Sequence, residues 1–137
     1  MRSETIEIAC ANRGYNKQQI EDAAAMMPES LQAFIRGVAF QAVIVEDLND
    51  GRIPDHKNYG QTKYEPVFDL SVPGPAGLGL AFNSAHYWFT STNAGARLQI
   101  LDRGDAVYFG THPEFQQIHA DALTYKAPVK NEENEKN

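Results

Sequence analysis

The chain has 137 residues, the size of one domain, and its 42% hydrophobic and 22% charged residues are typical of a folded globular protein. This composition argues against a disordered chain, a collagen-like repeat and a coiled coil. Twelve Lys and Arg against eighteen Asp and Glu give a net charge of −6, so bulk binding to duplex nucleic acid is not expected. The longest apolar stretch, residues 38–45, is interrupted by Gln41 and is too short to span a membrane, so no membrane partner is expected.

The two ends of the chain and its single cysteine indicate the compartment and the domain limits. The N-terminus lacks the basic start and apolar run of a secretory signal, and Cys10 cannot form an internal disulfide. We therefore expect a cytoplasmic protein. Residues 130–137 contain no apolar side chain. The sequence thus predicts a single domain over residues 1–129, followed by a disordered acidic tail over residues 130–137.

The first third of the chain favours helices. Residues 1–16 allow one short helix or strand. Asn16 and the helix formers that follow it predict a helix over about 17–27, which Pro28 ends. The clearest element comes next, because apolar residues recur at the spacing i, i+3, i+4, i+7 over about twenty residues up to Leu48.

A loop over residues 52–63 leads from this helix to a predicted sheet. The sheet has four candidate strands, over residues 64–71, 78–82, 87–92 and 97–101. They are separated by the turn-forming segments Pro73-Gly74-Pro75, Asn83-Ser84 and Asn93-Ala94-Gly95. Consecutive aromatic residues at 87–89 would face both sides of a strand. We therefore expect the second face of the sheet to be either covered or functional.

The last third of the chain returns to helix. Residues 102–110 fit a helix capped by Asp102 or a further strand, and we favour the helix. Thr111 and Glu114 resemble a capping box with a proline in the first turn, which predicts a last helix over about 112–125. The predicted fold class is α+β, with a small antiparallel sheet of about four strands packed against two to four helices.

No pattern in the sequence pairs a nucleophile with an oriented base. The Gly-x-Ser-x-Gly elbow is absent, as are His-x3-His and Cys-x2-Cys spacings, so we expect no metal and no cofactor. Cys10 is interpreted as an inert thiol. We therefore predict a protein that is not an enzyme. The enzyme alternative would assemble a site from Asp69, His86 or Arg97.

Cations and aromatic rings alternate in the middle of this acidic chain, which is typical of sites for flat anionic ligands. A nucleobase can stack on a ring while guanidinium or ammonium groups bind its phosphate. The alternative is that the rings belong to the core and that Arg97 pairs with a structural carboxylate. The predicted ligand-binding residues are Lys63, Tyr64, Tyr87, Trp88, Arg97 and Arg103.

Several short motifs follow one another in a characteristic order. They are the Leu48-Asn49-Asp50-Gly51 cap, the Ile53-Pro54-Asp55 loop, the strand Lys63-Tyr64-Glu65-Pro66-Val67-Phe68 and the element Gly95-Ala96-Arg97-Leu98. In this order they resemble a family of small uncharacterised proteins of phages and prophages of Bacteroidetes-type bacteria. The resemblance covers about residues 30–125, and residues 115–123 are similar to the family's last helix. The chain departs from the family at Glu65 and Val67, where relatives often carry Trp, and at Gln99-Ile100, where they carry Cys-Phe.

The resemblance implies a phage or prophage setting and no particular biochemical activity. Our first hypothesis is a non-enzymatic accessory protein that binds a small anionic, nucleotide-like ligand or a host defence protein, and so acts as a counter-defence factor in the host cytoplasm. A homo-oligomer is expected. The alternative is a structural or assembly component of a phage particle, with the aromatic segment at a subunit interface.

Overall fold

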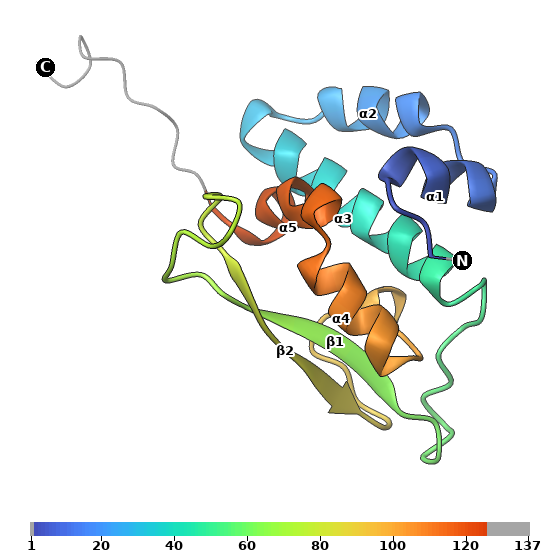
Figure 1. The fold of residues 1–137 in the computed structure, drawn as a ribbon. Helices are drawn as coiled ribbons and strands as arrows, with labels where there is room; N and C mark the ends of the chain where they lie inside the picture. Colours follow the sequence, from blue (N-terminus) through green and yellow to red (C-terminus); the bar gives the residue numbers. More distant parts are fainter. Residues whose placement is uncertain (1, 126–137) are drawn as a thin grey trace, which may run out of the picture.

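A layer of helices lies against a small antiparallel sheet in the computed structural model, which describes residues 2–125 (Figure 1). In chain order the elements are α1 (Ile6–Arg13), α2 (Lys17–Ala25), α3 (Glu29–Leu48), β1 (Lys63–Asp69), β2 (Ala81–Trp88), the 3-10 helix η1 (Ala96–Leu98), α4 (Arg103–Thr111), the 3-10 helix η2 (Pro113–Phe115) and α5 (Gln116–Leu123). These elements give an α+β fold. The tail predicted over residues 130–137 lies outside the described residues.

Caps set the limits of the two short N-terminal helices. The Thr5 hydroxyl accepts a hydrogen bond from the Ile8 amide at 3.2 Å at the start of α1, and Gly14, with φ 74°, ends that helix. Asn16 then accepts from the Gln19 amide at 3.1 Å and starts α2. The chain therefore turns at residues 14–16 and forms two helices.

Helix α3 lies at the centre of the helical layer and contacts α1, α2 and α5. Its buried face carries Phe40 and Ile44, which belong to one core cluster together with Phe109 and Phe115. The contact with α5 is very close at Gly37, where an added Cβ would lie 2.6 Å from the Ala122 nitrogen. Only glycine fits at this crossing.

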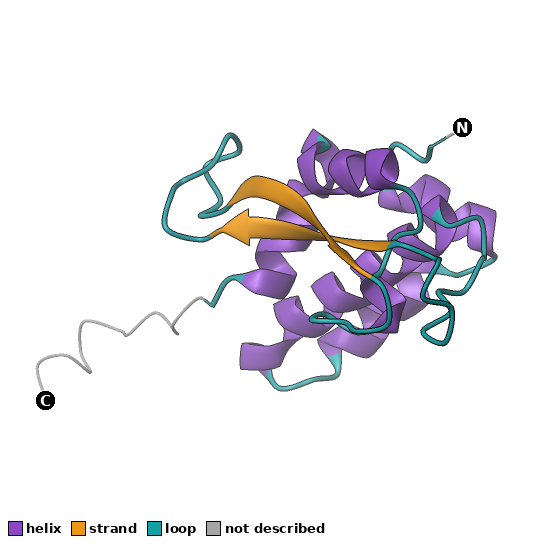
Figure 2. Cartoon of the chain, turned by 90° about the horizontal axis from the view of Figure 1, so that it is seen from below, coloured by secondary structure: helices purple, strands orange, loops and turns teal. Residues whose placement is uncertain are grey.

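The sheet consists of β1 and β2, paired antiparallel from Lys63 opposite Trp88 to Asp69 opposite Ala81. The register shifts where Val67 pairs with Ser84 and Phe68 pairs with Phe82, which leaves Asn83 as the extra residue of a bulge in β2. Helix α4 packs on one face of this sheet. Figure 2 shows the two strands, in orange, as a twisted pair.

The four-stranded sheet predicted from the sequence is not found among the described residues. The strands expected over 78–82 and 87–92 are replaced by the single strand β2, and the expected Asn83-Ser84 turn lies inside it at the bulge. The strand expected over 97–101 is the 3-10 helix η1 followed by one isolated bridge between Tyr64 and Ile100. Residues 64–71 do form a strand, because β1 covers most of them.

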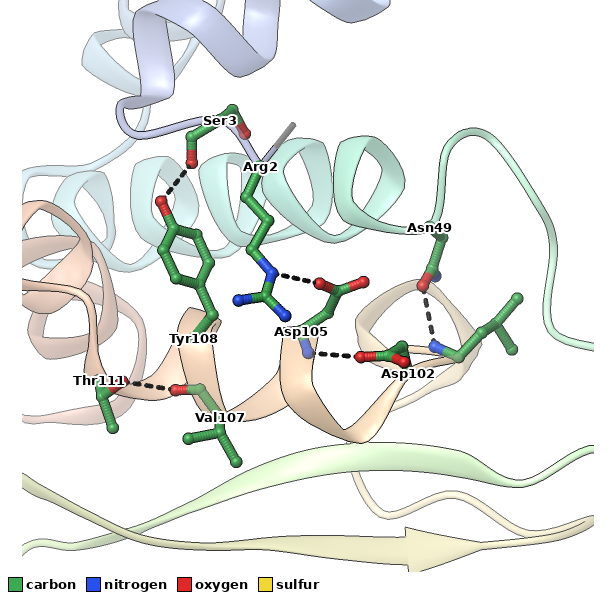
Figure 3. A network of polar contacts seen from close by, with 9 residues as sticks. Arg2, Ser3, Asn49, Asp102, Asp105, Val107, Tyr108 and Thr111 are labelled. Carbon is green, nitrogen blue, oxygen red and sulfur yellow. Dashed lines mark hydrogen bonds and ion pairs between the residues drawn. The ribbon is translucent and has the colours of Figure 1, made fainter.

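Polar contacts tie the N-terminal segment to α4 (Figure 3). The helix predicted over 102–110 is confirmed, and the Asp102 carboxylate caps it by accepting from the Asp105 amide at 2.9 Å. Arg2 forms an ion pair with Asp105 at 2.6 Å, and the Tyr108 hydroxyl donates to the Ser3 carbonyl at 2.9 Å.

The expected capping box at the start of the last helix is wrong. The Thr111 hydroxyl donates instead to the Val107 carbonyl at 2.7 Å, and Thr111 is the last residue of α4. The helix predicted over about 112–125 is divided into η2 and α5, because Pro113 begins a tight 3-10 turn before the α-helix starts at Gln116.

Candidate ligand-binding site

Lys63, the first predicted ligand-binding residue, is completely buried. Its Nζ lies 2.6 Å from the carbonyl oxygen of Asp55, 2.8 Å from that of Gln61, 3.2 Å from that of Asn58 and 2.5 Å from that of Phe89. The ammonium thus closes the loop 55–61 and binds it to the residue that follows β2. Because its donors are directed at the protein's own backbone, Lys63 cannot hold the phosphate of an external ligand. We call this arrangement the Lys63 cage.

Glu65 lies two residues further along the same face of β1 and has a comparable role. Only 4% of its surface is exposed, and its Oε1 accepts from the Thr92 hydroxyl at 2.6 Å and from the backbone nitrogens of Asn93 and Ala94 at 3.3 and 3.4 Å. The segment after β2 is thereby held against the second face of the sheet. That face was predicted to be either covered or functional. At Lys63 and Glu65 it is covered, by the segments that these side chains bind.

The three predicted aromatic residues lie in different surroundings. Tyr64 exchanges two backbone hydrogen bonds with Ile100, of 2.8 and 2.9 Å, and packs against the core. Trp88 is half-buried, with its ring 4.9 Å from that of His86. Tyr87 is 59% exposed, and its ring meets that of Phe89 edge-on at 5.8 Å. Tyr87 and Trp88 are neighbours in β2, and the ring of His86 lies 6.0 Å from that of Tyr87 as well as close to that of Trp88. None of the three predicted aromatic residues borders the cavity that Arg97 lines.

The two predicted arginines also lie apart in the fold. Arg103 is the exposed first residue of α4, whereas Arg97 is an exposed residue of η1. The six predicted residues therefore do not form one site. Arg97 alone among them borders the cavity described next.

A cavity of about 380 Å³ lies between the C-terminal half of α3 and η1. Its size is within the range of small-molecule sites. Its lining includes the apolar residues Ala42, Val45 and Ala96. The polar and charged residues of the lining, called the rim here, are Tyr15, Glu46, Asn49, Arg52 and Arg97. We call this cavity the Arg52–Arg97 cavity.

Local backbone geometry places the rim residues. Tyr15 stands at the turn between α1 and α2, and its hydroxyl donates to Oε2 of Glu46 at 2.7 Å. Arg52 follows the end of α3, where Asp50 and Gly51 have φ of 53° and 73° and reverse the chain direction. The Nε of Arg52 donates to the Asn49 carbonyl at 3.1 Å, which leaves the two terminal nitrogens of the guanidinium for other partners.

Asn49 connects the two walls of the cavity. It is almost fully buried, its side-chain amide donates to the Gln99 carbonyl at 2.9 Å, and its side-chain oxygen accepts from the Leu101 amide at 2.9 Å. The end of α3 is thus bonded to the segment that carries Arg97. These bonds fix the backbone segments that carry Arg52 and Arg97 relative to one another before any ligand binds.

The two arginines at the rim, Arg52 and Arg97, have no ion-pair partner in the described part of the chain, residues 2–125. The hydrogen bond to the Glu46 carboxylate raises the pKa of the Tyr15 phenol, and the positive charge of Arg97 opposes this shift. The prediction that Arg97 is available for a ligand is therefore retained, and the alternative of a structural carboxylate partner is not found within this range.

A second charged cavity, lined by Arg2, Arg13, Asp47 and Asp105 among others, shows the opposite arrangement. There Arg2 pairs with Asp105 at 2.6 Å, and Arg13 lies 3.5 Å from Asp47. Because these cations already have carboxylate partners, they are less suited to binding an external anion than Arg52 and Arg97.

An apolar groove of about 730 Å³ continues from the Arg52–Arg97 cavity along α3. The two share Tyr15, Ala42, Ala96 and Arg97. The groove is lined further by the apolar side chains Ile20, Phe34, Ile35, Val38 and Leu98. A ligand held by its anionic end at the arginines could therefore place an apolar part in this groove.

The titratable groups most often used in catalysis lie elsewhere. His119 is fully buried, and burial lowers its pKa to about 4, so it is neutral at pH 7 and bonds Gln41 and the Phe109 carbonyl. Burial raises the pKa of the Cys10 thiol, in agreement with its interpretation as inert. Within residues 2–125 no three His, Cys, Asp or Glu side chains are grouped so that they could hold a metal ion. The cavity supplies binding groups: two guanidinium groups, a phenol and an engaged carboxylate.

Sequence reasoning did not find Tyr15 or Arg52 as site residues. Tyr15 lies far from the aromatic segment in sequence, and Arg52 stands in a loop without periodicity. The only local signals were Gly14 and the Asn49-Asp50-Gly51 cap, which indicated that both residues sit beside helix ends. Their meeting depends on the packing of α1 and η1 against α3.

Searches with family models, with curated proteins and with solved structures found no match to this chain. No helix of the described part of the chain is long and apolar enough to cross a membrane.

Proposed function

We propose that the protein is a non-enzymatic binding protein that captures a small anionic, nucleotide-like ligand in the Arg52–Arg97 cavity. One observation carries this proposal: two arginines without a carboxylate partner among residues 2–125 border the same cavity as an exposed tyrosine ring. Arginine binds phosphate with two parallel hydrogen bonds, and an aromatic face stacks on a base. The cavity therefore combines the two kinds of contact that a nucleotide needs.

The biological setting is proposed from the sequence resemblance. A phage or prophage protein that sequesters a nucleotide-like signal in the host cytoplasm would act as a counter-defence factor without turnover. Binding of a host defence protein at the same cavity, through an acidic side chain, is the variant of this proposal that the apolar groove favours.

The proposal is tested by titration calorimetry with AMP, ADP and inorganic phosphate. We expect Arg97→Ala and Arg52→Ala each to weaken nucleotide binding by tenfold or more, because a hydrogen bond to a charged group contributes about 1.5–3 kcal/mol. Arg103→Ala is the matched control, since it removes an exposed arginine outside the cavity. Arg97→Lys keeps the charge but loses the planar fork, so it should bind more weakly than the wild type.

Native mass spectrometry of the protein purified from its natural host identifies the ligand itself. We expect an additional mass that is lost on denaturation and is absent from the Arg97→Ala variant. Equal binding by the wild type and Arg97→Ala, or equal losses in Arg97→Ala and Arg103→Ala, would contradict the proposal.

The alternative function, a structural or assembly component of a phage particle, is supported by a separate observation. The ring of Phe89 stacks on Tyr59 at 4.9 Å and meets Tyr87 at 5.8 Å. Tyr59 and Tyr87 are 70% and 59% exposed, so this aromatic cluster is on the surface. Exposed aromatic residues are enriched at protein interfaces.

A further inference from the structure

The outer edge of β2 has no partner strand within the described part of the chain. β2 pairs with β1 on one side, and none of residues 81–88 takes part in any other backbone hydrogen bond among residues 2–125. β1 differs, because Tyr64 on its outer edge is bonded to Ile100. In Figure 1, β2 is the outermost strand, on the side of the sheet away from the helical layer.

β2 lacks most of the features by which natural proteins protect such an edge. It contains no lysine, no proline and no other charged residue. Its one protective feature is the bulge at Asn83, which limits the regular edge to residues 84–88. A two-stranded sheet is marginal by itself, and most sheets have four or more strands.

The chain around β2 is also free of charge. No Asp, Glu, Lys or Arg occurs between Asp69 and Arg97, although 22% of all residues are charged. Several of these uncharged residues are exposed, such as Leu70 at 52% and Tyr87 at 59%. Depletion of charge and exposure of aromatic rings on one surface are features of interface cores.

We propose that β2 pairs antiparallel with β2 of a second copy of this chain, so that the two sheets become one four-stranded sheet. The charge pattern favours this edge as the contact between two copies. Two chains that each carry a net charge of −6 repel one another, and this repulsion is weakest when the charge-free edge of one copy meets the charge-free edge of the other. Antiparallel pairing of identical strands has two-fold symmetry, the commonest symmetry of homo-oligomers. The surface cluster of Tyr59, Tyr87 and Phe89 lies at the end of this edge and extends the contact.

The oligomeric state is measured first, by light scattering coupled to size-exclusion chromatography on the full chain. The chain mass is 15.2 kDa, and we expect a particle of twice that mass. Ser84→Lys places a charge on the uncharged β2 edge, where pairing would bring it against the partner strand, so we expect a monomer. Val67→Lys is the matched control, because Val67 pairs with Ser84 across the sheet but lies on the inner strand, so this variant should remain a dimer.

A cross-linking experiment keeps the proposal testable if a lysine variant does not fold. Antiparallel pairing of residues 84–88 with the same residues of a second copy places the two copies of residue 86 opposite one another. His86 is exposed, and the natural Cys10 is buried. Under air oxidation we therefore expect His86→Cys to form a covalent dimer and Val67→Cys to stay monomeric. A monomeric wild-type chain, including one that gains a strand only from a different protein, would overturn the proposal. So would a dimer that persists in Ser84→Lys. Neither result depends on nucleotide binding, so this proposal and the ligand proposal can fail separately.

Discussion

The Lys63 cage and the Arg52–Arg97 cavity both contain positively charged side chains, but these differ in whether the protein itself satisfies their hydrogen-bond donors. Lys63 is fully buried, and its ammonium is surrounded by four carbonyl oxygens of its own chain. Arg52 and Arg97 are exposed, and their terminal guanidinium nitrogens have no carboxylate partner within residues 2–125. A cation contributes to stability where its donors are satisfied internally, and it can contribute to binding where they are not. By this criterion Lys63 is a structural cation, and Arg52 and Arg97 are the cations that remain available to a ligand.

Lys63→Met should give the largest effect on stability. The variant keeps the length of the side chain but leaves several buried carbonyls without a donor, so we expect a loss of about 4 kcal/mol in the free energy of unfolding. Urea denaturation followed by circular dichroism measures it. A variant as stable as the wild type would show that the cage does not stabilise the fold.

The next largest expected change in stability comes from His119, which is also buried and has both ring nitrogens in hydrogen bonds. Its native pKa of about 4 lies below the ordinary 6.5, so between these values the unfolded chain binds a proton that the native protein does not. Stability is therefore complete above about pH 6.5 and decreases as the pH falls toward 4, by a total of about 3 kcal/mol.

The contribution of His119 is isolated by comparison with His119→Gln, which has no titrating ring. Urea denaturation at several pH values should show a steeper loss of stability in the wild type than in the variant. Parallel pH profiles would mean that other groups account for the acid sensitivity.

Tyr15→Phe should have a small effect on stability and a larger effect on nucleotide binding in the cavity. The variant removes an exposed hydrogen bond to Glu46, so we expect a loss below about 1 kcal/mol in thermal denaturation. It also releases the Glu46 carboxylate toward the arginines, which should weaken nucleotide binding in calorimetry. Tyr15→Phe that binds nucleotide as tightly as the wild type would show that the Glu46 contact does not matter for the site.

Arg97→Ala should change stability least, within about 0.5 kcal/mol, although we expect it to weaken ligand binding tenfold or more. Its side chain is exposed and forms no ion pair within residues 2–125. The same denaturation measurement as for Lys63→Met makes the two cations directly comparable. An unfolded Arg97→Ala variant would place Arg97 with Lys63 among the structural residues.

The long apolar period of α3 and the capping residues of α2 and α4 are local properties, so the sequence predicts these three helices well. For residues 1–16 the sequence left a helix and a strand open, and the structure has the helix α1. The limits of the strands depend on pairing between segments far apart in the sequence. Turn-forming residues alone therefore predict the strand boundaries wrongly. Asn83-Ser84 has the composition of a turn, yet pairing with β1 carries the strand through it as a bulge. Residues 97–101 contain strand-forming side chains, but the bonds of Asn49 to residues 99 and 101 hold this segment beside α3.

The sequence predicted which kinds of side chain form the candidate site, but not which residues. A ring combined with guanidinium groups describes the cavity, but Arg97 is the single predicted residue that borders it. A buried structural lysine such as Lys63 looks the same in the sequence as a ligand-binding lysine. Its role depends on carbonyl oxygens from two separate segments, the loop 55–61 and Phe89. Backbone acceptors carry no sequence signature, so a pattern of side chains cannot show that a cation is already used.

Asn49 has a consequence for how the cavity opens. Separation of the two walls breaks its bonds to the Gln99 carbonyl and to the Leu101 amide together. The Leu101 amide hydrogen therefore exchanges with solvent mainly during such openings, and its exchange rate reports how often they occur. A ligand that bridges Arg52 on one wall and Arg97 on the other would slow this exchange without touching Leu101. The exchange rate of the Leu101 amide would then report whether the cavity is occupied, although Leu101 does not contact the ligand.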